Sequence, residues 1–154
     1  MSPDLLENLQ TLFSKIANTD DGEGFSGRDV ELAAAALLIH CARADGHRSE
    51  VEDRKLREIL RTDYELAGSD ADDIVERATA DEAAAIDVHS FTRILHKNLD
   101  RTGRLQVVRQ LWEVAHADSK IDHEERSLVS LVASLMDVEV ADAVALRRNV
   151  TGNS

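Results

Sequence analysis

The feature that most constrains the fold is a short acidic segment that occurs twice. Residues 42–46 (ARADG) align with residues 115–119 (AHADS), at an offset of 73 residues. The same alignment continues without a gap and pairs Glu52 with Glu125. In each copy an apolar stretch precedes the turn, and a capped amphipathic stretch follows it. This self-similarity predicts two related helix–turn–helix units that pack as a pseudo-two-fold pair.

Composition and periodicity favour helices throughout. Aromatic residues make up 3% of the chain and proline occurs once, while apolar residues recur at helical spacing. The predicted fold class is therefore all-α, a bundle of about seven to eight helices. The expected helices cover residues 3–18, 28–44, 50–61, 70–84, 88–99, 103–117, 123–136 and 140–148, with N-caps at Ser49, Ser69, Asp87, Thr102 and Asp122.

The domain organisation follows from chain length and from one glycine-rich stretch. A chain of 154 residues suffices for one domain around a single core. Residues 1–27 are expected to form an N-terminal helix and a glycine-rich acidic loop, residues 28–150 the helical domain, and residues 151–154 a frayed tail.

The charge balance restricts the partners that this chain can bind. There are 18 basic and 30 acidic residues, a formal net charge of −12. Such a charge repels nucleic acid and anionic lipid, and it favours cations or a protein with a basic face. Cys41, the single cysteine, excludes an intramolecular disulfide and is predicted to be a core residue.

The sequence predicts a cytoplasmic protein without membrane insertion. The N-terminus has no basic segment followed by an apolar core, so it does not resemble a secretory signal. The longest apolar run, residues 32–39, is far shorter than the roughly 20 residues that span a bilayer.

Four carboxylates of the repeat are candidate metal ligands. Asp45 and Asp118 each follow the C-terminal end of a predicted helix, where the helix dipole disfavours another negative charge. Hard divalent cations bind carboxylate and carbonyl oxygens, and such a helix end offers both. If Glu52 and Glu125 converge on the same place, the four carboxylates could hold one or two ions such as Ca²⁺, Mg²⁺ or Mn²⁺.

A purely structural interpretation of the same residues stays open. Ser49 with Glu52, and Asp122 with Glu125, fit the capping-box pattern, and aspartate is a common turn residue. Zinc is less favoured than the hard ions, because the nearby histidines form no His-x-x-x-His pair and have no cysteine partner. These histidines are His47, His116 and His123.

The two motifs resemble those of a known family. Residues 44–46 through Glu52, and residues 111–118 through Glu125, are similar to the paired motifs of TerB-like domains. These occur in tellurite-resistance TerB proteins and in the N-terminal domain of the co-chaperone DjlA. The resemblance covers residues 29–148 and implies an all-helical bundle whose motif acids, here Asp45, Glu52, Asp118 and Glu125, bind divalent cations. It also implies a role in stress or tellurite resistance through partner complexes, often at membranes.

Three classes of function follow from these features. The first is a cation-responsive binding module that acts through a protein partner, and the second is an acidic interaction domain that needs no metal. An enzyme is disfavoured, because the sequence has no Ser-His-Asp arrangement, no glycine-rich phosphate loop and no reactive cysteine environment. We therefore expect a non-catalytic protein, and the sequence leaves the partner and the oligomeric state open.

Overall fold

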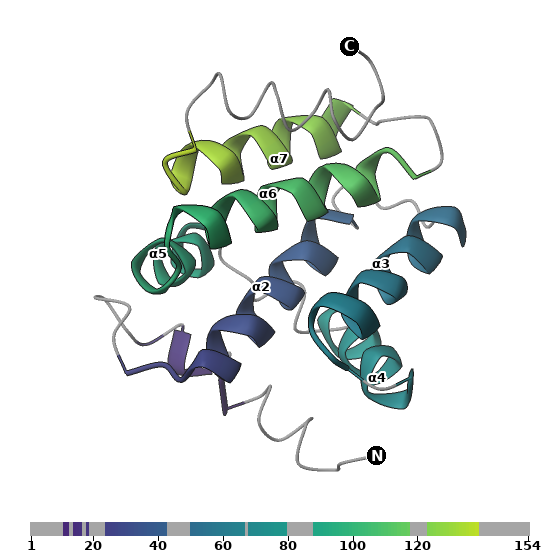
Figure 1. Ribbon diagram of the computed structural model, residues 1–154, viewed down its shortest axis with the longest axis horizontal. Coiled ribbons are helices and arrows are strands. Elements are labelled where there is room, and N and C mark those ends of the chain that lie inside the picture. Colours follow the sequence, from purple (N-terminus) through teal and green to yellow (C-terminus); the bar gives the residue numbers. More distant parts are fainter. Residues whose placement is uncertain are drawn as a thin grey trace.

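The computed structural model describes residues 11–12, 14–16, 18, 24–42, 50–66, 68–79, 88–117 and 123–138. Its helices are α2 (Gly27–Ala42), α3 (Glu50–Asp63), α4 (Gly68–Thr79), α5 (Val88–Asn98), α6 (Arg101–Ala115) and α7 (His123–Leu135). The described residues of the expected first helix, 11–12, 14–16 and 18, are helical as well. No strand occurs among the described residues, which confirms the predicted all-α fold (Figure 1).

Helix α2 is the centre of the bundle. It contacts α3, α4, α5, α6 and α7 (Figure 1). Residues 32–39 are buried without interruption, and four of them are consecutive alanines. A helix that is apolar on all sides belongs in a core, and the small alanine side chains allow neighbouring helices to approach closely. Cys41, near the end of α2, is 2% exposed, which confirms its predicted place in the core.

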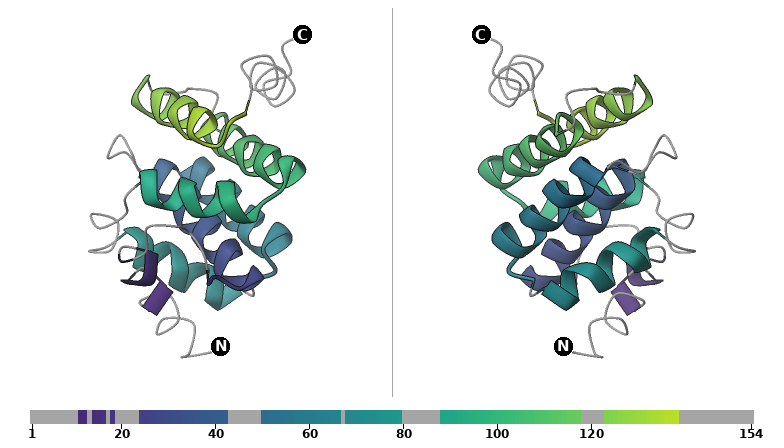
Figure 2. Two further views of the ribbon diagram at one scale, coloured as in Figure 1. Left: turned by 90° about the vertical axis from the view of Figure 1, so that its left-hand side faces the viewer. Right: turned by 90° about the vertical axis from the view of Figure 1, so that its right-hand side faces the viewer.

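The two copies of the repeat pack reciprocally. The first copy supplies α2 and α3, and the second supplies α6 and α7. The two leading helices, α2 and α6, contact each other; α3 also packs on α6, and α7 packs on α2. Figure 2 shows α6 and α7 lying next to each other along one side of the molecule. Each unit thus contacts the leading helix of the other.

Most of the apolar positions predicted from the sequence are buried. In α6, Val108, Leu111 and Trp112 belong to the core, together with Leu12 and Ile16 from the N-terminal segment. Because the core includes the N-terminal segment, residues 11–16 and the helical domain share one apolar interior in the described part of the chain.

One predicted core residue is wrong. The helical periodicity of residues 50–61 predicts that Val51 faces inward with Leu56 and Leu60, but Val51 is 42% exposed. Leu56 follows Val51 by five positions, and five steps of a helix rotate the side chain by roughly 140° away from the buried stripe. Glu52, four residues before Leu56, lies on that stripe instead.

Two of the predicted N-caps are also corrected. Helix α6 begins at Arg101, and its cap is Asp100 rather than Thr102, because the Asp100 carboxylate accepts the Gly103 backbone N–H at 2.8 Å. Helix α4 begins at Gly68, so Ser69 lies inside it. The expected N-caps Ser49, Asp87 and Asp122, residues 80–84 of the fourth helix and the last helix at 140–148 lie outside the described residues.

The C-terminus of α7 is closed by a left-handed residue. Asp137 has φ of 56°, the Val138 N–H donates to the Ala133 carbonyl at 3.0 Å, and the Asp137 N–H donates to the Ser134 carbonyl at 3.1 Å. This is the Schellman arrangement, which satisfies carbonyls at a helix end.

Across the described helices, none has the length and apolar content that crossing a bilayer requires.

Candidate functional site

Of the four predicted metal ligands, Glu52 has a described side chain. It lies in the first turn of α3, half-buried, on the face that Leu56 and Leu60 direct into the core. Glu125 lies in the first turn of α7, but its side chain is outside the described residues, as are Asp45 and Asp118 altogether. The convergence of the four carboxylates therefore stays a prediction.

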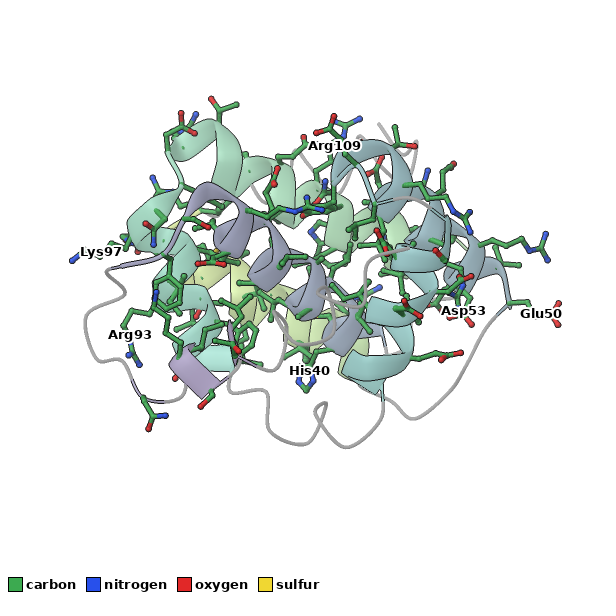
Figure 3. All side chains as sticks on the ribbon, turned by 90° about the horizontal axis from the view of Figure 1, so that it is seen from below. His40, Glu50, Asp53, Arg93, Lys97 and Arg109 are labelled. Atoms are coloured by element: carbon green, nitrogen blue, oxygen red, sulfur yellow. The ribbon has the colours of Figure 1, made fainter. Side chains whose placement is uncertain are left out.

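The first turn of α3 is strongly acidic. It contains Glu50, Glu52 and Asp53, and Figure 3 shows Glu50 and Asp53 at the beginning of this helix. Acidic side chains are stabilised there by the positive end of the helix dipole. Glu50 reaches Arg54 at 3.9 Å, with both side chains mostly exposed, so this pair contributes little to stability. Within the described residues, no three His, Cys, Asp or Glu side chains are grouped as a metal site would require.

The histidines considered for zinc do not form a ligand set in the described part of the chain. The His116 ring packs on the Trp112 indole, with ring centroids 5.9 Å apart. His47 and the side chain of His123 lie outside the described residues. His96, on α5, has its Nε2 atom 2.8 Å from Asp137 Oδ2, a contact that links α5 to the turn after α7.

The paired helices and their motifs match a known family. The family model described as tellurite resistance protein TerB matches residues 31–148, more than half of the chain. The chain belongs to the TerB family. The match includes both copies of the motif of this TerB-family protein, together with α3 through α7. Neither the curated proteins nor the solved structures gave a match to this chain.

This TerB-family protein also has a cavity that the sequence analysis missed. Its volume is about 380 Å³, and it lies between the beginning of α2, the end of α3, the end of α5 and the first part of α6. Residues from four separate segments form its walls, so no local motif could reveal it. One signal was present: Gln110 interrupts an otherwise apolar stripe of α6 and is 2% exposed.

A chain of hydrogen bonds that runs from the buried Tyr64 to the exposed Asp63 lines this cavity. The Tyr64 hydroxyl donates to Gln110 Oε1 at 2.6 Å, and Gln110 Nε2 donates to Asp63 Oδ2 at 3.0 Å. Burial raises the pKa of Tyr64 well above its ordinary value, and the charges of Asp63 and Glu31 raise it further. The phenol therefore stays protonated at physiological pH, and its proton is committed to Gln110.

Proposed function

We propose that this protein is a non-catalytic, divalent-cation-binding module that acts through a protein partner. The cation ligands in this proposal are Asp45, Glu52, Asp118 and Glu125. The observation that carries it is the position of Glu52: a carboxylate on the buried face of α3, beside two leading helices that pack on each other.

The ligand chemistry supports a hard ion. The four side chains are carboxylates, and the carbonyls at a helix C-terminus add neutral oxygen ligands, a set that suits Ca²⁺, Mg²⁺ or Mn²⁺ better than Zn²⁺. Asp45 and Glu52 belong to one copy of the repeat, and Asp118 and Glu125 to the other. A shared ion would therefore fasten the two copies together and fix the shape of the surface around both turns.

The partner is proposed to be a protein with a basic face. The net charge of −12 favours such a surface and disfavours nucleic acid. The matching family is described by tellurite resistance, which supports a role in a stress response or as a scaffold.

An acidic docking domain that needs no metal is the alternative function. The acidic first turn of α3 favours it, because a helix N-terminus stabilises acidic side chains without any ion. In this case Glu52 caps its own helix, and the partner recognises the acidic surface directly.

Thermal unfolding of metal-stripped protein separates the two functions. A cation at 100 times its dissociation constant adds about 2.7 kcal/mol to the free energy of unfolding. We expect one of Ca²⁺, Mg²⁺ or Mn²⁺ at millimolar concentration to raise the midpoint, and Asp45→Asn or Asp118→Asn to abolish the rise.

Glu50→Gln is the matched control, because it removes an exposed charge from the same turn as Glu52. This variant should keep the full response to the cation. If no ion shifts the midpoint of the wild-type protein, the cation site is refuted and the acidic docking domain is favoured.

A further inference from the structure

The cavity lies toward the opposite end of α2 from the first motif. Val30 lines it, whereas the first motif follows Ala42 at the other end of α2. Ala34, the lining residue of α2 nearest to the motif, is about 12 Å from Ala42 along the helix, at 1.5 Å per residue. The volume of about 380 Å³ falls within the range of small-molecule sites. The cavity is therefore a second candidate site, independent of the proposed cation ligands.

Part of the cavity wall is apolar. Phe25, Val30, Leu99 and Val107 line it, and Gly103 gives it room on the side of α6. A Cβ atom at Gly103 would lie 3.2 Å from the Leu99 side chain, closer than ordinary packing allows. Such a wall holds the apolar body of a ligand.

Other residues of the wall present hydrogen-bond acceptors. Because the Tyr64 hydroxyl donates its proton to Gln110, its oxygen is left as an acceptor, and it accepts no hydrogen bond within the described part of the chain. The carboxylates of Asp63 and Glu31 also line the cavity. A ligand that meets this wall must bring N–H or O–H donors.

The electrostatics further restrict the ligand. Besides burial, the carboxylates of Asp63 and Glu31 raise the pKa of Tyr64, as a negative potential at the phenol would. Arg28 Nη1 lies 3.3 Å from Glu31 Oε1, so the guanidinium offsets the negative charge of Glu31. The same guanidinium donates to the Tyr64 carbonyl at 2.9 Å and so holds the backbone at Tyr64 in place. The Asp63 carboxylate accepts from the neutral Gln110 amide, so an anionic ligand is repelled and a cationic one is attracted.

We propose that this cavity binds a small organic cation, whose ammonium group donates to Asp63 and to the Tyr64 oxygen while its apolar body packs against Phe25, Val30 and Val107. The chemical class is an amine with a compact apolar group. Gln110 acts as a positioning residue, because it holds both the phenol and the Asp63 carboxylate in place.

Amide spectra recorded by nuclear magnetic resonance during a titration with 2-phenylethylamine test this site. The titration is performed in the presence of a chelator, so its outcome does not depend on the proposed cation site. We expect the backbone signals of Gly27 and Gly103, which line the cavity, to shift with the amine. The isosteric 2-phenylethanol should bind more weakly, and 3-phenylpropanoate more weakly still.

Two variants address charge and access. Asp63→Asn removes the charge but keeps an oxygen that can accept from Gln110, and it should weaken amine binding about tenfold. Its control is Glu76→Gln, which removes an exposed charge from α4 outside the cavity and should leave amine binding unchanged.

Gln106→Trp should block access of the amine at the exposed rim of the cavity. Arg109→Trp is the control, because Arg109 is at an exposed position of α6 (Figure 3) that does not line the cavity, and this variant should leave binding unchanged.

Three results would overturn the proposal. One is the absence of shifts at Gly27 and Gly103 with millimolar amine. Another is binding of 3-phenylpropanoate as tight as that of the amine. The third is an amine affinity that Asp63→Asn leaves unchanged.

Discussion

Two polar residues, Thr92 and Gln110, are buried in the described core. Thr92 satisfies its hydroxyl within its own helix, by donating to the Val88 carbonyl at 2.7 Å. Gln110 instead depends on Tyr64 and Asp63, which lie more than 40 positions away in the sequence. A buried polar side chain is therefore hydrogen-bonded within its own helix in α5, but to residues that are distant in the sequence in α6.

Tyr64→Phe should destabilise the protein. The substitution leaves Gln110 Oε1 buried without its donor, and a buried unsatisfied polar group costs about 1–3 kcal/mol. Thr92→Val is the comparison, because the Val88 carbonyl remains near other helix donors and the change should be close to neutral. The free energy of unfolding in urea measures both.

A double variant isolates the contact between Tyr64 and Gln110. In a Gln110→Leu background no amide oxygen remains to be satisfied, so Tyr64→Phe should cost much less than in the wild type. Equal costs in the two backgrounds would show that the hydrogen bond does not explain the effect.

His40 makes the stability of the fold depend on pH. Burial lowers the pKa of His40 below its ordinary value of 6.5, so the unfolded chain binds this proton more readily than the folded one. The contribution of neutral His40 to stability is complete above about pH 6.5 and is lost as the pH falls below that value.

His40→Gln should therefore reduce the loss of stability between neutral and mildly acidic pH. The free energy of unfolding at the two pH values, for wild type and variant, checks this. His89→Gln, at an exposed position of α5, should keep the wild-type loss. If the His40→Gln variant loses as much stability as the wild type between the two pH values, His40 is not the cause of the pH dependence.

At the scale of elements, α2 shows how small side chains permit central packing. Ala33, Ala35 and Ala36 are fully buried, and five other helices contact this one. The alanine run therefore sets how closely those helices approach, and added volume there has no free space to occupy.

Ala36→Leu should lower the free energy of unfolding by about 1–3 kcal/mol through overpacking. The same side chain introduced by Ser130→Leu, at an exposed position of α7, should change it by less than about 0.5 kcal/mol. Urea unfolding of the two variants makes the comparison, and equal small effects would show that α2 is not tightly enclosed.

The sequence was sufficient to predict the helices that the structure describes and their order, because helical periodicity is a local signal. It was weaker at their boundaries. Asp100 and Thr102 are both good N-caps, and only the connection from α5 decides between them. Val51 was misassigned because an apolar side chain in a first turn need not lie on the buried stripe.

The two candidate sites differed in how far the sequence could predict them. The repeated acids form a pattern that is visible in one dimension, so Asp45, Glu52, Asp118 and Glu125 could be named at once. The cavity is made by side chains from four distant segments. The Tyr64 oxygen can accept a hydrogen bond from a ligand because the hydroxyl proton is donated to Gln110. Such a site follows from tertiary packing and has no sequence pattern of its own.

At the scale of the whole molecule, the account rests on the reciprocal packing of two repeats. Each unit contacts the leading helix of the other, so an ion held by both motifs would bridge the units that form the core. The family match covers both copies, and the acidic charge of the chain suits a cation and a basic partner.

The most direct test of this account is calorimetric titration of metal-stripped protein with the cation that stabilises it, repeated with Asp45→Asn and with Asp118→Asn. These two acids belong to different copies of the repeat. A shared site predicts that either substitution alone abolishes the binding seen in the wild type. Unchanged binding in both variants would contradict the account, as would variants that each retain half of the wild-type stoichiometry, because the copies would then bind separately.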